Sequence, residues 1–463
     1  MGADASESAR VLALLKRHGR TATSFQALEP GLRYWFDADD ACVAYADTGA
    51  AWVTVGAPLA SAARERAVMA DFAAAGARAG RRVRWFGLER DLADADGVWR
   101  TLEMGRQPCW DPAAGQHILA TKSSLREQLR RARAKGVAVR RADPAELGAT
   151  DHPTRQALER LITRWLTTRP MPPLRFAVEV APFSFPEERR CFLAHRGPTL
   201  VAALIAVPIY QSRGWLLEDA LRDPEAPNGT MELLFFAALD ELATEGSGPV
   251  TFGLAPLAET RSRTLRWIAR LTPWLYHFDG LHRFKAKLQP EAWLPVYLGL
   301  PRRERGVAAV VDLLTAFSGG SLLRFAWATA RHRAPVVVRI LALLLVPWTV
   351  LLWLADARWF PGPVVQIGWV ALDVLLFVGL MHLARRWRKR LALLLALAAA
   401  ADFAVGLLQV VLHNLPRVAG ACDVVLIGLA LMAPLAAAIF LWAAREWPQI
   451  SSSSRSSSSA SSP

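Results

Sequence analysis

One stretch of the chain carries acidic and basic side chains around a turn. It reads LEDALRDPEAPNGTMELLFF, in which a strand ends near Asp219 and Arg222 and a helix begins near Glu232. A carboxylate such as Asp219 can bind an amine or accept a proton, and Arg222 can hold a phosphate. Two structural roles fit the spacing equally well: an ion pair between Asp219 and Arg222, and a Glu232 that complements the helix dipole.

A second stretch, LHRFKAKLQPEAW, places Lys285 and Lys287 among aromatic residues. We expect a loop that leads into a strand here. Lysine beside aromatic rings suits a phosphate or a terminal base. Surface lysines whose aliphatic chains cover apolar residues while their ammonium groups stay in water would give the same pattern, so both interpretations stay open.

A third stretch, TKSSLREQLRRARAKG, has the period of a helix with a basic face and an apolar face. Only Glu127 offsets the positive charge, so this face should attract phosphates of an RNA acceptor stem or of lipid head groups. A solvated surface helix is the alternative. The basic face consists of Lys122, Arg126, Arg130 and Arg133, and the apolar face of Leu125, Leu129 and Ala132.

The elements that must position these residues form two successive α/β units in the first 300 residues or so. Runs rich in β-branched and aromatic residues predict strands that alternate with helices. The expected strands are Cys42–Tyr45, Trp52–Val55, Val83–Phe86, Val137–Arg141, Phe192–Ala194, Thr199–Ile209, Gly214–Glu218 and Val250–Gly253. The expected helices include Ser61–Ala79, Arg155–Thr167 and Met231–Thr244.

Four long apolar runs follow, each about as long as a helix needs to cross a bilayer. Asp373 and Asp402 fall within two of them, where we expect them to face the interior of a helix bundle. Hydrogen bonding between helices is the favoured role for this pair, and a proton or substrate path is the alternative. The four runs are Val336–Ala355, Val364–Ala384, Leu391–Leu412 and Cys422–Ala444.

Basic residues cluster beside the beginning of the first run, between the second and third runs, and after the fourth. Because cytoplasmic loops are enriched in Lys and Arg, we expect both termini and the large N-terminal part to lie in the cytoplasm. These residues are Arg331, Arg333, Arg339, Arg385, Arg386, Arg388, Lys389, Arg390 and Arg445.

The composition limits the classes of protein to consider. The chain has 463 residues, 53% of them hydrophobic, and a net charge of +14, which excludes a disordered chain and favours polyanionic partners. Its four cysteines are widely spaced and are expected to be free thiols, and no metal site is expected. Sequence motifs of P-loop nucleotide hydrolases, serine hydrolases, zinc proteases and dinucleotide-binding proteins are absent.

Four segments together resemble motifs of the aminoacyl-phosphatidylglycerol synthases, the bacterial phosphatidylglycerol lysyltransferases and alanyltransferases. The family patterns SxDLMR, GTMDFLF, NLGxAPL and GLRxFKxKFxP correspond in order and spacing to LEDALR (217–222), GTMELLF (229–235), FGLAPL (252–257) and GLHRFKAKLQP (280–290). Ser24–Phe25, Ala44–Tyr45 and WVTVGAP (52–58) are similar to the opening strands and the G-x-P turn of the family. Leu217, Ala220, Leu221 and Glu232 depart from the pattern and leave the preferred donor open.

This resemblance implies an α/β fold of tandem GNAT-like acyltransferase domains joined by the basic helix, with aminoacyl-tRNA as donor and phosphatidylglycerol as acceptor. It implies that Asp219 contacts the aminoacyl amine or the hydroxyl proton, and that Arg222 and Lys285 contact a phosphate. Glu232 would be an alternative acid or base, and Lys287 would support the site. Neither a cofactor nor a metal is implied. Family members usually carry their membrane helices before the catalytic part, so we expect the larger flippase module to be absent here.

The resulting division of the chain has six parts: a first GNAT-like domain (1–121), the basic linking helix (122–136), a second GNAT-like domain with the active site (137–300), a basic juxtamembrane segment (301–335), four transmembrane helices (336–445) and a Ser-rich tail (446–463). The expected function is transfer of an amino acid to phosphatidylglycerol in a bacterial inner membrane. The alternatives are a peptidoglycan-type aminoacyltransferase and a non-catalytic module that binds RNA or anionic lipid. The oligomeric state is left open.

Overall fold

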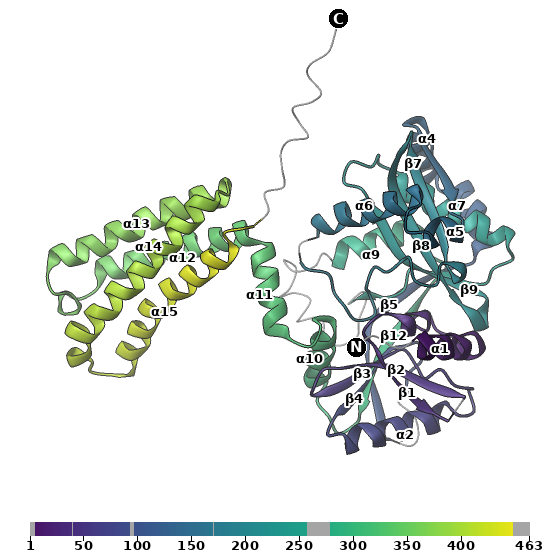
Figure 1. Cartoon of the computed structure of the whole chain (residues 1–463), viewed down its shortest axis with the longest axis horizontal. Helices are drawn as coiled ribbons and strands as arrows, with labels where there is room; N and C mark the ends of the chain where they lie inside the picture. Colours follow the sequence, from purple (N-terminus) through teal and green to yellow (C-terminus); the bar gives the residue numbers. More distant parts are fainter. Residues whose placement is uncertain (1–4, 39, 93–96, 170, 257–277, 448–463) are drawn as a thin grey trace, which may run out of the picture. The chain divides into compact units, whose positions relative to one another are not determined.

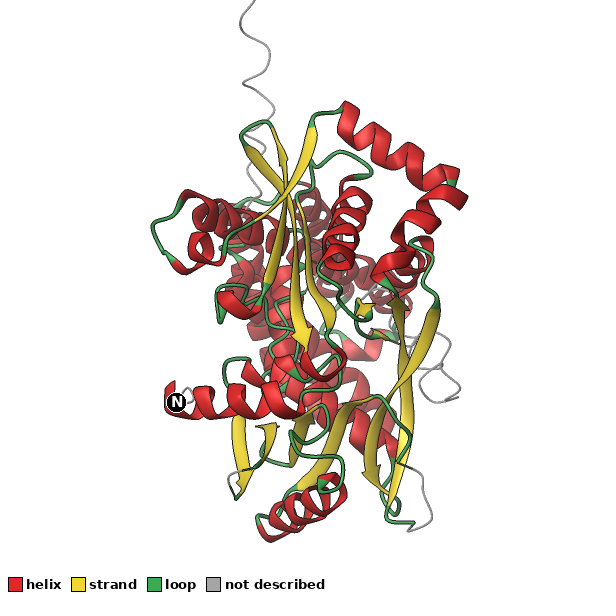
Figure 2. Ribbon diagram, turned by 90° about the vertical axis from the view of Figure 1, so that its right-hand side faces the viewer, coloured by secondary structure: helices red, strands yellow, loops and turns green. Residues whose placement is uncertain are grey.

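The structure is a computed structural model that describes residues 5–38, 40–92, 97–169, 171–256 and 278–447. The chain forms two compact units, residues 1–325 and 326–463 (Figure 1). In the first unit helices flank the strands of a mixed sheet (Figure 2). The second unit is helical.

The strands of the first unit belong to one twelve-stranded sheet with the order β1-β2-β3-β4-β12-β5-β10-β9-β8-β7-β6, and β11 pairs with β5 beside this path. The strands are β1 (Arg33–Asp37), β2 (Ala41–Asp47), β3 (Ala51–Val55), β4 (Arg82–Leu88), β5 (Trp99–Trp110), β6 (Val137–Arg141), β7 (Arg190–Arg196), β8 (Thr199–Ile209), β9 (Gly214–Arg222), β10 (Val250–Thr251), β11 (Ala255–Pro256) and β12 (Ala292–Pro301).

The same arrangement occurs once in each half of the sheet. Strands β3 and β4 are parallel and are connected by helix α2 (Glu65–Arg78), and strands β9 and β10 are parallel and are connected by helix α7 (Thr230–Thr244). An antiparallel strand precedes each of these βαβ units, β2 in the first half and β8 in the second. The expected α/β fold with two similar units is thus confirmed.

Strand β12 departs from the sequence-based division of the chain. We expected this segment within a second domain at 137–300, but β12 lies between β4 and β5 and pairs with both (Figure 1). Its ten-residue ladder with β5 joins the two halves through backbone hydrogen bonds. The two halves therefore share one sheet, because β12, the last strand that the structure describes, is inserted beside β4 of the first half.

The segment before β12 is a helix, α9 (Phe278–Lys287), where we expected a loop. Leu288 is fully buried, and Phe284 packs against the same core. Together with Leu281 these residues recur at i, i+3 and i+7, the spacing of a helical face, and Pro290 prevents the helix from continuing. The aromatic residues around the two lysines obscured this helical spacing in the sequence, so a loop was predicted instead.

The linking helix has the expected amphipathic character. It is α4 (Ser123–Ala134), preceded by the short helix α3 (Gly115–Thr121). Leu125, Leu129 and Ala132 are buried against the core of the second half. The apolar face thus holds the helix on the sheet, while its basic residues remain on the outer side.

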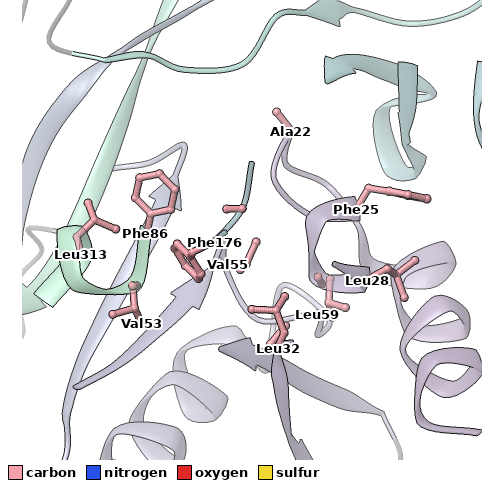
Figure 3. Packing of buried hydrophobic residues seen from close by; sticks show 14 of the residues in the cluster. Ala22, Phe25, Leu28, Leu32, Val53, Val55, Leu59, Phe86, Phe176 and Leu313 are labelled. Carbon is pink, nitrogen blue, oxygen red and sulfur yellow. The ribbon is translucent and has the colours of Figure 1, made fainter. Parts of the chain in front are cut away.

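Helix α10 (Gly306–Phe317) belongs to the first unit, although we expected residues 301–335 to form a juxtamembrane segment. Its Leu313 lies with Val53, Val55, Phe86 and Phe176 in one hydrophobic cluster (Figure 3). The rings of Phe86 and Phe317 are 5.4 Å apart in an edge-to-face arrangement. The apolar face of α10 therefore extends the core of the first half.

Asp312 of α10 anchors this helix through buried charges. Its carboxylate accepts hydrogen bonds from Arg82 at 2.7 and 3.0 Å and from Arg84 at 3.0 Å. Arg84 is fully buried and also pairs with Glu304. A buried guanidinium requires such partners because the loss of its hydration is costly.

In its described residues, 326–447, the second unit contains four helices that are long and apolar enough to cross a membrane. They are α12 (Ala334–Leu354), α13 (Pro363–Arg385), α14 (Lys389–Gln409) and α15 (Ala421–Ala444). They match the four apolar runs of the sequence. Helix α10 and helix α11 (Leu322–His332) form a pair bent by 58°. If this pair is counted as one broken span, the described residues contain up to five candidate spans. Asp373 is buried between helices, where it accepts a hydrogen bond from Thr349 at 3.3 Å.

One end of the helical unit is strongly basic. Trp447 donates a hydrogen bond to the carbonyl of His332 at 2.9 Å and its ring lies 5.5 Å from that of Trp387, while Lys389 and Glu446 form an ion pair at 2.8 Å. The beginning of α12, the end of α13, the beginning of α14 and the end of α15 therefore meet here. This end also contains Arg331, Arg333, Arg385, Arg386, Arg388, Arg390 and Arg445, whereas the links at the other end carry only Arg358 and Arg417 with Asp356 and Asp423.

The substitution Asp312→Ala should lower the free energy of unfolding of the first unit by about 3–5 kcal/mol, because it leaves Arg84 buried with fewer charged partners. Urea unfolding of the full chain in detergent, followed by tryptophan fluorescence, measures this change. Asp71→Ala, on the exposed face of α2, is the matched control and should change stability by less than about 0.5 kcal/mol. Equal stability of the two variants would contradict the assigned role of Asp312.

Candidate active site

A bulge in β9 determines where two acidic side chains point. Ile205 of β8 pairs with Asp219, and the next residue, Ala206, pairs with Leu217, so that Glu218 is an extra residue in β9. Such a bulge re-aims side chains locally. Leu217 and Ala220 pack on the face covered by α7, so Glu218 and Asp219 both lie toward the opposite face.

Glu218 is neutralised by an ion pair with Arg189, and both side chains are almost completely buried. The guanidinium of Arg189 also lies 5.1 Å from the centre of the Phe25 ring, which comes from the first half of the sheet. This cation–π contact connects the two halves close to the bulge. Neither Arg189 nor Glu218 was among the residues that we predicted for the site.

Asp219 is only 8% exposed, and its Oδ2 atom has no hydrogen-bond partner. Burial raises the pKa of Asp219 well above its ordinary value, the charge of Glu218 raises it further, and Arg189 opposes the shift. The buried and unpaired Asp219 is therefore a better candidate for chemistry than an Asp219–Arg222 ion pair would have been.

Glu29 is a second buried carboxyl group near this point. It follows the 3-10 helix Phe25–Leu28 of the first half and is only 7% exposed. Burial raises the pKa of Glu29 to about 9, and the charge of Glu218 raises it further. A backbone hydrogen bond with Glu179 opposes this rise, and the charges of Asp219 and Glu179 add smaller contributions to it. No sequence motif pointed to Glu29, because it lies in an ordinary turn (ALEPG) far from the acidic strand in the sequence.

Glu232 and Lys287 form a separate pair on the side of the sheet that α7 covers. Lys287 donates a hydrogen bond to Oε1 of Glu232 at 2.6 Å. Glu232 is buried in the first turn of α7, and Lys287 lies at the end of α9 and is partly exposed. The structure thus brings together two predicted residues that are 55 positions apart, but it places them across the sheet from Asp219.

Lys285 is buried and holds a backbone turn. Its Nζ donates hydrogen bonds to the carbonyl oxygens of Phe252, Gly253 and Leu254 at 2.9–3.0 Å. Burial lowers the pKa of Lys285 to about 7. Three protons directed at three carbonyls favour a positioning role, in which Lys285 fixes the turn between β10 and β11.

That turn lies where two parallel strands separate. Strands β9 and β10 pair only at Trp215–Leu216 and Val250–Thr251, and β11 then pairs with β5. Gly253 in this turn has a positive φ of 62°, which favours glycine. The segment that follows β10 is therefore held by Lys285 and β5 instead of by β9.

Arg222 ends β9 and is exposed. It donates a hydrogen bond to the carbonyl of Ala226 at 2.7 Å within the loop that leads to α7. Gly229 at the N-cap of α7 has φ = 90°, and a Cβ atom there would lie 2.3 Å from the carbonyl oxygen of Gln128 in α4. The loop of Arg222 is thus fixed against the basic helix, because only glycine permits this approach.

The basic residues of the linking helix line an open groove of about 640 Å³ between α3 and α4. Arg126, Arg130 and Arg133 contribute to it together with apolar side chains such as Leu119 and Leu129. Arg126 also donates to the carbonyls of Leu119 and Ala120, and Arg130 pairs with Glu127 at 2.8 Å. Lys122, the fourth predicted residue, immediately precedes the helix.

Within the residues that the structure describes, no group of three or more His, Cys, Asp or Glu side chains could hold a metal ion. The four cysteines are free, and Cys42 and Cys191 are buried. The candidate site thus combines buried acids at the β9 bulge, an exposed arginine, and lysines that contact α7 and the β10–β11 turn.

Comparison with known proteins identifies the family. Residues 12–299 match the family model described as phosphatidylglycerol lysyltransferase, C-terminal. The chain belongs to this family. A phosphatidylglycerol lysyltransferase of Bacillus subtilis (strain 168) is 33% identical over 131 residues, which are 26% of this chain and only 15% of that relative. As a member of the phosphatidylglycerol lysyltransferase family, the chain carries the predicted motifs within the matched residues.

Two solved structures are similar to this phosphatidylglycerol lysyltransferase family member in fold. The C-terminal domain of a putative lysylphosphatidylglycerol synthetase from Agrobacterium fabrum has a TM-score of 0.59 at 20% identity and covers 69% of this chain and 99% of its own. L-PGS from Bacillus licheniformis has a TM-score of 0.59 at 19% identity and covers 68% of this chain and 97% of its own. The expected α/β fold, followed by four apolar helices in the described part of the chain, is confirmed.

Replacing Glu29 by glutamine should change how stability depends on pH. Between the ordinary pKa of about 4.5 and the folded value of about 9, the folded state holds the proton of Glu29 more tightly than the unfolded state does, so wild-type stability falls as pH rises. In Glu29→Gln this contribution is absent. The variant should gain up to about 1.4 kcal/mol relative to wild type for each pH unit between pH 5 and 8.

Urea unfolding of the full chain in detergent at several pH values measures this difference. Glu7→Gln, on the exposed face of α1 (Ala5–His18), removes a carboxylate without this burial and should follow the wild-type profile. A constant difference between Glu29→Gln and wild type across the range would show that Glu29 titrates normally and would contradict the assigned environment.

Proposed function

We propose that this chain transfers an amino acid, lysine or alanine, from aminoacyl-tRNA to a glycerol hydroxyl group of phosphatidylglycerol. The observation that carries the proposal is the family match over residues 12–299, which includes Asp219, Glu232 and Lys285. The four apolar helices in the same chain support a substrate that resides in a membrane.

The proposed reaction exchanges one ester for another. The glycerol oxygen forms a bond to the carbonyl carbon of the aminoacyl group, the bond from this carbon to the ribose oxygen of the tRNA breaks, and the proton of the glycerol hydroxyl ends on that ribose oxygen. No net oxidation or hydrolysis of a nucleotide is needed. The protein has to position the two substrates and stabilise the negative charge that develops on the carbonyl oxygen.

Each predicted residue then has a role in this proposal. Asp219 binds the aminoacyl amine or takes the hydroxyl proton, which its unpaired Oδ2 atom supports. Arg222 binds a phosphate of the lipid or of the tRNA end, and its exposed position supports this role. Lys285 positions the β10–β11 turn through its three carbonyl contacts, and the pair Glu232–Lys287 is the alternative acid–base pair.

The basic helix is the proposed contact for tRNA. Arg126, Arg130 and Arg133 line the groove beside α3, and a polyphosphate backbone would complement their charge. The helix packs against α7 through Gly229, so a bound tRNA would be linked to the loop of Arg222. Anionic lipid head groups are the alternative ligand for this surface.

We expect the basic end of the helical unit, with the catalytic part and both termini, to lie on the cytoplasmic side of a bacterial inner membrane. The asymmetry of Arg and Lys between the two ends supports this orientation. The proposed donor, aminoacyl-tRNA, is present only on that side. Transfer of a cationic amino acid there would make the lipid surface less negative.

Expression of the chain in a host that lacks aminoacylated phosphatidylglycerol, followed by lipid extraction and mass spectrometry, tests the proposed reaction. We expect a new amine-positive phosphatidylglycerol, and a loss of at least about 100-fold with Asp219→Asn, in which the carboxyl group is replaced by an isosteric amide. Asp71→Asn, on the exposed face of α2, should retain wild-type product levels.

Absence of the lipid product with altered cell-wall peptides would instead indicate a peptidoglycan-type aminoacyltransferase. Absence of both products, with RNA or lipid binding retained, would indicate a binding module. Either outcome would contradict the proposed reaction.

The exposed Cys422, in the first turn of α15 at the less basic end of the helical unit, provides a native probe of orientation. A membrane-impermeant maleimide should label it in intact spheroplasts. Cys422→Ser should abolish this labelling, and Lys389→Cys in that background should react only after permeabilisation. Labelling of Lys389→Cys in intact spheroplasts would contradict the cytoplasmic orientation.

A further inference from the structure

Helix α10 is apolar on two opposite faces. One face is buried in the core of the first half. The other face carries an apolar stripe of Val307, Val311 and Leu314, which are 57%, 45% and 47% exposed and recur at i, i+4 and i+7. A helix on a water-exposed surface normally presents charged or polar side chains at these positions. The buried face consists of Ala309, Val310, Leu313 and Ala316.

Exposed apolar side chains of the first unit concentrate on this part of the chain. Within its described residues, five of the eight large apolar side chains that are exposed belong to α10 and to the first turn of α11. Single exposed apolar residues are normal, whereas a concentration of them marks an interaction surface. The eight are Val98, Val178, Leu294, Val307, Val311, Leu314, Leu322 and Leu323.

The turn before α10 adds positive charge beside the stripe. Arg302, Arg303 and Arg305 are exposed there. Glu304, the acid among them, pairs with the buried Arg84 and so offsets a charge of the core. An apolar stripe next to arginines is typical of a helix that lies in the head-group region of a membrane, because the apolar side chains reach the acyl boundary while the arginines contact lipid phosphates.

The chain enters its first candidate membrane span soon after α10. Helix α10 ends at Phe317, and α12 begins at Ala334. Between them the 11 residues of α11 extend about 16 Å. A bilayer that holds α12 is therefore within reach of the stripe. It also offers both the apolar layer and the anionic surface that the stripe and the arginines complement.

The buried face of α10 distinguishes a helix that lies on a membrane from one that crosses it. By length and composition α10 and α11 together could form one broken span. Such a span would separate Asp312 from Arg82 and would deprive the fully buried Arg84 of one of its carboxylate partners. Helix α10 is therefore held on the first unit, and its outer face is the part that can contact lipid.

We propose that the outer face of α10 is a membrane-docking surface for an anionic phospholipid bilayer. The stripe enters the head-group region, and the three arginines contact lipid phosphates. This contact holds the first unit, with its candidate active site, at a lipid surface. Helix α10 follows residues 12–299, which match the family model, so this surface lies outside the matched segment. The inference does not depend on the proposed transfer reaction.

Fluorescence quenching of the full chain in lipid nanodiscs tests this surface. Val311→Cys in a Cys422→Ser background is labelled with the fluorophore NBD, and the discs contain phosphatidylcholine and phosphatidylglycerol. We expect strong quenching by a phospholipid that carries a nitroxide near its head group, and protection from iodide in the water. The Cys422→Ser parent, without the added cysteine, gives the background labelling of the remaining thiols.

Asp71→Cys in the same background is the matched control. It lies on the exposed side of α2, which covers the opposite face of the sheet through Val68, Met69 and Phe72. Its label should be quenched by iodide and not by the nitroxide lipid.

Replacement of Arg302, Arg303 and Arg305 by glutamine tests the contribution of charge. In discs with phosphatidylglycerol, each replacement should lower the ratio of docked to undocked protein roughly five-fold, as reported by nitroxide quenching of the Val311→Cys label. In discs of phosphatidylcholine alone the replacements should have little effect.

Three results would overturn the proposal. Quenching of the Val311→Cys label by iodide and not by lipid would show that the stripe remains in water. Protection from both quenchers would show that protein covers it, either the helical unit or a second copy of the chain. An unchanged docking ratio in the arginine variants would exclude the contact with lipid phosphates. Absence of aminoacylated lipid, with the expected quenching intact, would overturn only the proposed reaction.

Discussion

The burial of carboxyl groups at the β9 bulge is the constraint on which the rest of the site depends. A regular strand would place Glu218 and Asp219 on opposite faces, whereas the extra residue turns both toward the side opposite α7. Arg189 neutralises Glu218, and the Oδ2 atom of Asp219 remains without a hydrogen-bond partner. A buried carboxyl oxygen without a partner is energetically costly, which favours a functional role for Asp219.

The shared sheet positions the elements of this site relative to one another. Strand β12 returns from the second half to pair with β4 and β5, and α9 directly before it carries Lys285, which binds the β10–β11 turn. The turn, the acidic strand and the short helix of Glu29 are therefore tied to one hydrogen-bonded framework. Asp312 adds α10 to the same framework through Arg84.

The sequence predicted those features that depend on local periodicity. The apolar runs of the membrane helices and the apolar face of α4 follow from side-chain spacing, and both are present in the structure. Pairings between distant segments could not be predicted in this way, such as the pairing of β12 with β5 and the contact of Lys287 with Glu232. The motif pointed to Asp219, but Arg189, which neutralises the neighbouring Glu218, lies in a segment that has no motif of its own.

The most direct test of the account is a reconstituted reaction. The purified full chain is incorporated into phosphatidylglycerol vesicles and supplied with lysyl-tRNA, and the lipid product is followed by mass spectrometry. The account predicts that lysine leaves the tRNA and appears as an ester of phosphatidylglycerol without added nucleotide or metal. Vesicles and lysyl-tRNA that both remain unchanged in the presence of folded protein would contradict it.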